Sequence, residues 1–546
     1  MSAPAAVLRV TTRLVVVDVV AADKRGQAVA DLKAEDFTLL EDGKPQQIRV
    51  FSFEHPPLPG ASFVPKALNL PPHVFTNIPT YNASNTLNII LLDGLNTTLP
   101  NQAYARQQMI NYLDKIPAGQ PIAVYLLGRK LRLVLDFTAD PSVLKTAIKS
   151  MKSQASPFMD HPLGGTQEPD LVGRDMPLQM QQVLKAFAEE QLSFQTDLRV
   201  EYTIDALNAL ARALSGYQGR KNLIWISEAF PINIAPDMSL GINASNRVRQ
   251  YEEKITETAE ALVDAQIAIY PIDARGVASA PLFDAKSTRI NPAAALGQTD
   301  PVQQQMDDQT SNILASHDTM KELAQRTGGR AYYNRNDLDD AIRNSMEDGS
   351  TYYTLAYYPA TKDWNGKFRK VEVKVNRPGI TLRHRPGYYA FDPTAARDPK
   401  LRFAAFGQAL SLDTPIATGL RFEAGIVPPS AKAGKVIVNF ALDPRGISFE
   451  KQDDDLQHAK VDCAVRAFTP KGQLVKTEAS TVTPAYKPDA FTQVMQSLFY
   501  CHQSIELPAG DYLLRLGVLD QHTGLIGTTN AKITVSSTVA HDDKRD

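Results

Sequence analysis

An apolar run that ends in an acid is the first feature of this sequence that suggests chemistry. Residues 87–92 read LNIILL, and Asp93, Asn96 and Thr97 follow them. Acidic, amide and hydroxyl side chains at the end of a buried strand can hold a ligand there. They can equally form an Asx-turn, or cap a helix that begins near Asn101, with no ligand involved. The elements around Asp93 have to position these groups for either role.

The sequence contains no recognisable set of catalytic residues. It contains no G-x-S-x-G, H-E-x-x-H, Walker or G-x-G-x-x-G pattern at a strand-to-helix turn. Asp273 and Arg275 follow another apolar run, and we expect them to pair and fix the loop in which they lie. The sequence therefore predicts that the protein is not an enzyme.

Residues 87–349 alternate between strand-like and helix-like segments. The strands are nearly continuous apolar runs, as expected when helices cover both faces of a parallel sheet. We predict an open parallel α/β sheet of the Rossmann-like kind for this segment. The predicted strands are TLNIILLD, PIAVYLLG, LRLVLDFT, NLIWISEAF and IAIYPIDARG, with a short one at RAYYN. The predicted helices are 101–115, 142–153, 177–192, 203–215, 246–265, 316–326 and 336–346.

Two stretches within this segment show no helical or strand periodicity. They are residues 156–177 and 276–309, and we predict that both are long loops. Long loops in a compact domain are usually functional or mobile. We therefore expect them to contribute to a binding surface.

The segments on either side of the α/β region are strand-like. Residues 1–60 contain a hairpin with an Asp-Gly turn, and residues 350–395 contain another with Asn-Gly. Neither segment has enough strands to cover its own apolar face. We predict that the two pair into one β-sandwich, with the α/β domain 87–349 inserted between them. Residues 61–86 are rich in proline and are predicted to be a linker.

The C-terminal third reads as a separate β domain. Residues 400–536 contain about seven short strand candidates, which favours an immunoglobulin-like β-sandwich, and residues 537–546 form a polar tail predicted to be disordered. The only two cysteines, Cys463 and Cys501, lie in two of these strands. They can form a disulfide between two sheets, which would imply an oxidising compartment. The alternative is two buried free thiols.

Composition excludes some classes of partner. The 546 residues include 58 Lys and Arg against 60 Asp and Glu, a net charge of -2, so we expect no nucleic-acid partner. No stretch offers the roughly 20 apolar residues that a membrane span requires. The N-terminus has no basic start followed by an apolar core, so the sequence does not begin with an intact signal peptide.

The sequence resembles von Willebrand factor type A domain proteins, because several separated motifs occur in the same order. The resembling segments are LNIILLDGLNT, GRKNLIWISEAFP, AIYPIDARG and LAQRTGGRAYYNRNDLDDAI. With DFTLLEDGK and YYTLAYYPATKDWNGKFRKVEVKVNRPG, they are similar to a related group of proteins from acidobacteria. The resemblance covers roughly residues 8 to 392 and does not include the C-terminal sandwich.

The resemblance implies a metal-ion-dependent adhesion site. In the family, Asp-x-Ser-x-Ser after the first strand binds Mg²⁺ or a similar ion, with a Thr and an Asp from two other loops. One coordination position is left for an acidic side chain of a partner. Such a site would lie at the carboxyl ends of the parallel strands.

This sequence departs from the family pattern. Asp93 matches the first acid and Thr97 the last Ser, but Leu95 replaces the middle Ser. The implied metal ligands are therefore Asp93, Thr97 and Thr203. Asn96 and Glu228 are possible additions, and Glu201 is an alternative to Thr203 by register. Mg²⁺ or another divalent cation is possible at such a degenerate site, although the substitution weakens the ligand set.

Two functions fit this sequence. The first is a non-enzymatic adhesion module that binds a partner protein at the carboxyl edge of the α/β sheet, through the degenerate metal site or without it. The alternative is a structural subunit that self-assembles in an extracellular or periplasmic complex, with a vestigial site. We predict a secreted or periplasmic protein, with a cytoplasmic location as the alternative.

Overall fold

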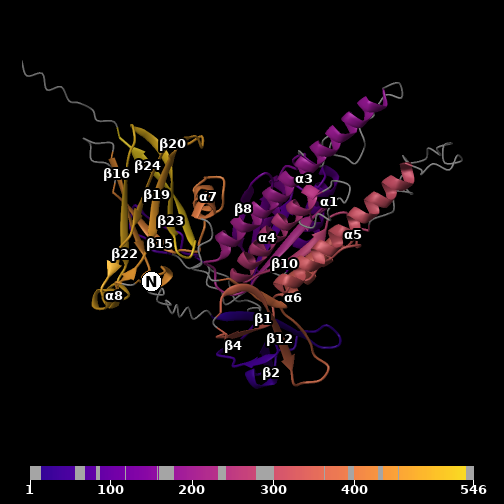
Figure 1. Cartoon of the computed structure of the whole chain (residues 1–546), viewed down its shortest axis with the longest axis horizontal. Coiled ribbons are helices and arrows are strands. Elements are labelled where there is room, and N and C mark those ends of the chain that lie inside the picture. Colours follow the sequence, from indigo (N-terminus) through magenta and orange to yellow (C-terminus); the bar gives the residue numbers. More distant parts are fainter. Residues whose placement is uncertain are drawn as a thin grey trace, which may run out of the picture. The chain divides into compact units, whose positions relative to one another are not determined.

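A computed structural model describes most of the chain, in two compact units (Figure 1). Unit 1 comprises Met1–Phe63, Ser84–Leu207 and Gly219–Ala390, and unit 2 comprises Val64–Ala83, Asn208–Gln218 and Phe391–Asp546. The residues described are 14–55, 68–80, 86–116, 119–156, 158, 177–230, 242–277, 301–361, 363–391, 399–427, 435–452 and 454–536. The tail predicted at 537–546 lies outside them, as do most of the first predicted loop and residues 278–300 of the second.

Unit 1 contains a five-stranded, mostly parallel sheet in the order β10-β9-β6-β7-β8. Its strands are β6 (Leu87–Asp93), β7 (Ile122–Leu127), β8 (Leu131–Thr138), β9 (Lys221–Ser227) and β10 (Ile267–Asp273). The parallel arrangement predicted for this region is confirmed for every pair except one, because β8 runs antiparallel to β7. Residues 128–130 between these two strands are too few for the crossover that a parallel pair needs, so they form a hairpin.

Helices cover this sheet and explain its apolar sequence. Every residue of β6, β9 and β10 is buried. Side chains including Ile90, Ile224 and Tyr270 form one core with α1, α2 and α6. Alternate side chains such as Leu91 and Trp225 are also buried and point to the opposite face. The helices of the unit are α1 (Leu99–Leu113), α2 (Pro141–Ser150), α3 (Leu178–Leu214), α4 (Ile242–Asp264), α5 (Pro301–Thr327) and α6 (Leu338–Asp348); the last residues of α3, from Asn208 on, belong to unit 2.

Three predictions for this region were wrong in detail. The helices expected at 177–192 and 203–215 are one helix, α3, because residues 193–202 contain neither Pro nor Gly to interrupt it. Helix α5 begins at Pro301, inside the second predicted loop; proline is well suited to the first position of a helix. The short strand expected at RAYYN is reduced to one parallel bridge between Ile272 and Tyr332.

The strands on either side of the central sheet pair with each other. One sheet has the order β13-β1-β11-β4 and the other β14-β12-β2-β3. We call the two sheets the flanking sandwich; both combine strands that precede the central sheet with strands that follow it, and their inner side chains share one core. The bounds are β1 (Val15–Ala22), β2 (Phe37–Glu41), β3 (Lys44–Gln46), β4 (Val50–Glu54), β11 (Tyr352–Tyr357), β12 (Asn365–Val375), β13 (Thr381–Arg383) and β14 (Gly387–Phe391).

Buried and partly buried polar groups lie where the amino end of β9 meets the flanking sandwich, and we call Asp18, Arg220, Lys221 and Tyr352 the Lys221 cluster. The backbone N–H of Arg220 donates to the Tyr352 hydroxyl at 3.1 Å. Asp18 accepts a hydrogen bond from Thr354 at 3.0 Å. Burial lowers the pKa of the Lys221 ammonium to about 7, although the negative charge of Asp18 acts in the opposite direction.

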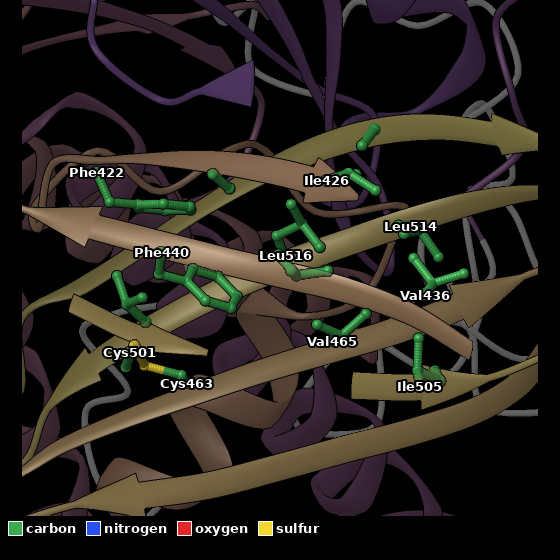
Figure 2. Packing of buried hydrophobic residues seen from close by; sticks show 14 of the residues in the cluster. Phe422, Ile426, Val436, Phe440, Cys463, Val465, Cys501, Ile505, Leu514 and Leu516 are labelled. Carbon is green, nitrogen blue, oxygen red and sulfur yellow. A yellow bond between two sulfur atoms is a disulfide. The ribbon is translucent and has the colours of Figure 1, made fainter. Parts of the chain in front are cut away.

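Unit 2 contains two four-stranded antiparallel sheets, ordered β22-β16-β15-β5 and β20-β19-β23-β24. We call them the C-terminal sandwich; Figure 2 shows side chains such as Phe440 and Leu516 meeting between the two sheets. Strand β5 comes from the segment predicted to be a linker and pairs with β15. The strands are β5 (Val74–Thr76), β15 (Phe422–Val427), β16 (Lys435–Leu442), β19 (Val461–Phe468), β20 (Leu474–Val482), β22 (Phe499–Glu506), β23 (Gly510–Asp520) and β24 (Ile526–Val535).

Smaller elements complete unit 2. Helix α7 (Pro399–Ala409) packs through Phe406 on a second apolar cluster that includes Ala464 and Leu519. The remaining elements are β17 (Glu450–Lys451), β18 (Gln457–His458), β21 (Ala485–Tyr486) and α8 (Pro488–Val494).

Candidate functional site

The structure brings all five proposed ligand residues together at the carboxyl end of the central sheet. Asp93 ends β6, and Asn96 and Thr97 lie in the loop before α1. Thr203 reaches this loop from α3, since its hydroxyl accepts a hydrogen bond from Asn96 Nδ2 at 3.0 Å. Glu228 follows β9, and its backbone N–H donates to Thr97 Oγ1 at 3.1 Å. With Arg199, introduced below, we call these residues the Asp93 cluster.

The Asp93 carboxylate is buried and accepts five hydrogen bonds. Oδ1 accepts from the backbone N–H groups of Leu95 at 3.1 Å and Asn96 at 2.8 Å. Oδ2 accepts from Asn96 Nδ2 and Ser227 Oγ at 2.9 Å and from Trp225 Nε1 at 3.0 Å. Burial raises the pKa of Asp93, and these hydrogen bonds, which favour the charged form, oppose that rise. The two backbone bonds form the Asx-turn considered above as the alternative to a ligand site.

Glu228 caps the helix that follows the Asp93 loop. Its Oε2 accepts hydrogen bonds from the backbone N–H of Thr98 at 2.9 Å and from the Thr98 hydroxyl at 2.6 Å. Thr98 is the N-cap residue of α1, and its own side chain makes no capping bond. A carboxylate at this place also interacts favourably with the positive end of the helix dipole. Glu228 is therefore committed to holding the start of α1.

An arginine that the sequence analysis missed completes the cluster. Arg199 on α3 is half-buried, and its Nε donates to Asn96 Oδ1 at 3.1 Å. Burial lowers the pKa of this guanidinium, and the negative charges of Asp93 and Glu228 oppose the shift. Arg199 lies four residues before Thr203, and residues four apart share one face of a helix. A continuous helix through this segment would have revealed it, but the predicted break concealed it.

The oxygen atoms of the Asp93 cluster do not fit a divalent cation. A carboxylate offers about four lone-pair positions, and Asp93 already accepts five hydrogen bonds. The Thr203 hydroxyl accepts from Asn96 and donates to the Arg199 carbonyl at 2.8 Å, and Arg199 itself occupies Asn96 Oδ1. Leu95, at the middle Ser position, is buried and offers no oxygen. Glu201, the alternative to Thr203, instead pairs with Lys254 at 3.4 Å.

Within the described parts of the chain, no three His, Cys, Asp or Glu residues are grouped so that they could hold an ion. Mg²⁺ needs near-octahedral oxygen coordination. The cluster as it stands would have to break several hydrogen bonds to supply it.

A second acid lies at the same edge, at the end of β10. Asp273 forms a two-pronged pair with Arg275, with Nε and Nη2 donating at 2.9 and 2.7 Å, which confirms the pairing expected from the sequence. The sequence did not indicate that His317 Nε2 would lie 2.9 Å from Asp273 Oδ2 and that its ring would stack on Tyr333. These contacts fix the loop after β10 against α5.

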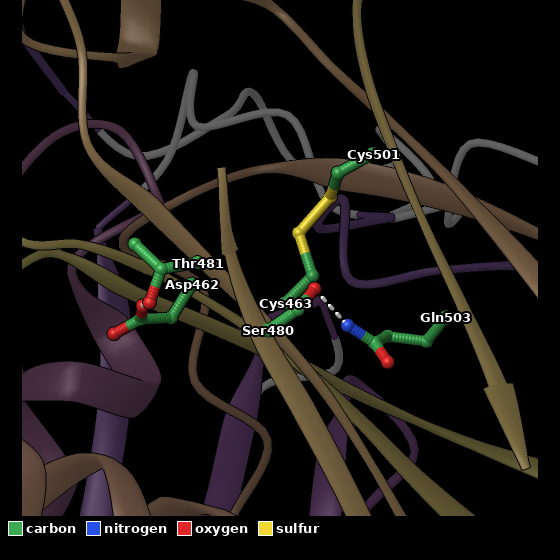
Figure 3. The surroundings of a disulfide bond; sticks show 6 residues. All are labelled: Asp462, Cys463, Ser480, Thr481, Cys501 and Gln503. Atoms are coloured by element: carbon green, nitrogen blue, oxygen red, sulfur yellow. Dashed lines mark hydrogen bonds between the residues drawn. A yellow bond between two sulfur atoms is a disulfide. The ribbon is translucent and has the colours of Figure 1, made fainter. Parts of the chain in front are cut away.

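The two cysteines form a disulfide in the core of the C-terminal sandwich (Figure 3). Cys463 is on β19 and Cys501 on β22, so the bond joins the two sheets. Close to it, Gln503 donates a hydrogen bond to Ser480, and the Thr481 hydroxyl donates to Asp462 at 2.6 Å. Of the two alternatives that the sequence left open, the structure has the disulfide.

No family model and no curated protein matches the sequence. Similar solved structures include an aerotolerance-related membrane protein from Bacteroides fragilis NCTC 9343, at 12% identity and a TM-score of 0.25, covering 48% of this chain and 98% of that one. BatB from Bacteroides thetaiotaomicron is 13% identical with a TM-score of 0.23, covering 48% and 97%. A von Willebrand factor type A protein from Catenulispora acidiphila is 10% identical with a TM-score of 0.22, covering 91% and 76%.

These TM-scores are too low to support a conclusion about this chain. The fold and the site are therefore assigned from the chain's own residues. They define a mixed α/β protein with a mostly parallel sheet and a polar cluster at its carboxyl end. Among the helices of the described residues, none is long and apolar enough to cross a membrane.

Proposed function

We propose that this chain is a non-enzymatic protein-interaction module that contacts a partner protein at the carboxyl end of its central sheet. The observation that carries the proposal is a row of exposed apolar side chains on α3: Met180, Val183, Phe187 and Phe194. Each of them is more than half exposed. We call this row the α3 stripe.

The spacing of the α3 stripe gives it the character of a binding surface. Steps of three, four and seven residues place the four side chains on one face of the helix. Large apolar groups gathered on one face are typical of interaction sites, whereas single exposed ones are ordinary. Helix α3 also supplies Arg199 and Thr203 to the Asp93 cluster, and Figure 1 shows its N-terminal half running out beyond the sheet. A partner on the stripe would therefore approach the carboxyl end of the sheet.

The finer assignments are part of the same proposal. We infer that the central sheet with its helices is a von Willebrand factor type A domain, inserted in the flanking sandwich. Its support is the Asp93 loop after a buried first strand, with Thr203 and Glu228 converging on it. We infer that the C-terminal sandwich is immunoglobulin-like, which a disulfide between two antiparallel sheets supports. The disulfide also favours a secreted or periplasmic location.

A structural subunit is the second candidate, favoured by exposed apolar side chains in unit 2. Leu474, Val475, Leu498 and Tyr500 are all large and exposed. In a self-assembling subunit such side chains would be covered by further copies of the chain. Light scattering on the purified protein separates the candidates, because a defined large oligomer supports the subunit and a monomer excludes it.

The proposed partner surface can be tested with a photo-crosslinking residue placed at Phe187. A matched control places the same residue at Leu133, an exposed apolar position on β8. We expect a protein of the source organism to crosslink at position 187 and not at 133. The purified partner should then bind Phe187→Ser/Phe194→Ser at least ~10-fold more weakly, and Leu133→Ser with unchanged affinity. Equal crosslinking at both positions would contradict the proposal.

A further inference from the structure

The Asp93 cluster contains two carboxylates, one of them buried and the other partly buried. Asp93 is buried, and Glu228 is tied to the start of α1. A carboxylate removed from water is strongly disfavoured unless hydrogen bonds or a counter-charge compensate it. The hydrogen bonds to Asp93 come from neutral donors: two backbone N–H groups and the side chains of Asn96, Trp225 and Ser227. They satisfy its lone pairs but bring no full positive charge.

The charge comes from Arg199, and the cluster holds it in place. Its guanidinium interacts electrostatically with both Asp93 and Glu228. Asn96 connects the two sides: it accepts from Arg199 Nε through its oxygen and donates to Asp93 and Thr203 through its nitrogen. Thr203 then bonds back to the Arg199 carbonyl, one helical turn earlier. Arg199, Asn96 and Thr203 therefore form a closed ring of hydrogen bonds.

We propose that Arg199 is the resident cation of this site, taking the charge role of a divalent ion, so that the site works without metal. A second cation here would face the guanidinium and would have to displace donors from Asp93. The consequence that partner binding ignores chelators rests on the proposed function. The charge role of Arg199 does not depend on it.

The test uses the full chain, stripped of metal, as wild type and as Arg199→Ala and Arg199→Lys. Arg326→Ala is the matched control, since Arg326 lies in the same unit and pairs with Glu322 at 2.6 Å, away from the cluster. Thermal unfolding is followed with chelator, with Mg²⁺ and with Mn²⁺, and calorimetry measures ion binding directly. Asp93→Asn in the Arg199→Ala background shows whether any ion binds at this site.

We expect the wild type, Arg199→Lys and Arg326→Ala to give flat titrations and the same Tm with or without ions. Arg199→Ala should unfold at a lower temperature and recover by ~3 °C or more in millimolar Mn²⁺. Without the guanidinium, Asn96 is no longer held in place, so its side chain can turn its oxygen toward the ion and release Asp93 Oδ2 and Thr203 Oγ1. Asp93→Asn should remove that recovery.

Three results would overturn the proposal. They are saturable ion binding by the wild type that Asp93→Asn abolishes, an Arg199→Ala protein that ions do not restore, and an Arg199→Ala protein as stable as the wild type. None of these measurements involves a partner protein. Failure of the proposed function would show instead in the crosslinking experiment, with the ion responses unchanged.

Discussion

The central sheet has a cluster of charged residues at each end, and the two clusters are built differently. At the carboxyl end, Asp93 accepts five hydrogen bonds and half-buried Arg199 supplies the charge. At the amino end, Lys221 is almost fully buried, and Arg220 Nε and Asn222 Oδ1 are buried without a hydrogen-bond partner. One end is a hydrogen-bonded network near an exposed helix. The other is a set of charges enclosed by packing.

The difference indicates what each end is for. A network of several hydrogen bonds around one buried carboxylate holds its residues in one arrangement, and such rigidity suits a surface that a partner recognises. A buried polar atom without a hydrogen-bond partner lowers stability, and a group enclosed by packing offers no surface to a partner. The amino end is therefore best understood as the junction that joins the sheet to the flanking sandwich.

Removing Asp93 is the strongest test of the difference between the two ends of the sheet. Asp93→Ala leaves five donors without their acceptor, so we expect the free energy of unfolding to fall by about 4 kcal/mol. Chemical denaturation followed by tryptophan fluorescence measures this, and the indole N–H of Trp225 is one of the donors. A loss below about 1 kcal/mol would mean that the network adds little to stability.

The amino end predicts a pH dependence of stability in the neutral to mildly alkaline range. The pKa of Lys221 is lowered to about 7, whereas the unfolded side chain titrates near 10.5. Between these pH values the unfolded chain binds more protons, so the free energy of unfolding increases with pH. From pH 7 to 9 we expect Lys221 to contribute a rise of about 2 kcal/mol.

Denaturation at several pH values tests this rise on the wild type and on Lys221→Met. The variant should lose it, whereas Lys254→Met, which changes an exposed lysine, should keep it. Parallel pH profiles of the wild type and Lys221→Met would show that Lys221 titrates normally.

The smallest expected effect concerns the cap of α1. Glu228→Gln keeps an oxygen that can accept from Thr98 but removes the charge at the helix N-terminus, so we expect a loss of about 1 kcal/mol. Glu201→Gln, which changes an exposed acid paired with Lys254, should cost under about 0.5 kcal/mol. Equal losses from the two variants would show that the cap charge has no special role.

Much of the site was predictable, for a simple reason. Parallel strands place their carboxyl ends at one edge, so the residues after β6 and β9 had to meet, and Thr97 and Glu228 do. Arg199 was not predictable, because the sequence between residues 192 and 203 was not recognised as helical. The hydrogen bonds that saturate Asp93 were also beyond sequence reasoning, since two of the donors, Trp225 and Ser227, come from a strand 132 and 134 residues away.

The fold was predictable where the sequence patterns were long, and its prediction failed where they were short. Continuous apolar runs identified the central strands, but their direction depended on connections, and residues 128–130 made β8 antiparallel. Strand β5 has only three residues, too few for any period, and its partners on β15 lie 347 to 351 residues later in the chain, from Thr76 opposite Glu423 to Val74 opposite Gly425. A pairing at that separation leaves no local signal.

The bond between Cys463 and Cys501 has a mechanical consequence. A force that stretches the C-terminal sandwich is transmitted through the two sulfur atoms. It does not load the segment between Cys463 and Cys501, which includes β20 and α8. The two residues are 38 positions apart, so roughly 130 Å of extensible chain stays locked until a reductant cleaves the bond. Under tension in an oxidising environment, this part of the molecule would behave as a short, stiff link.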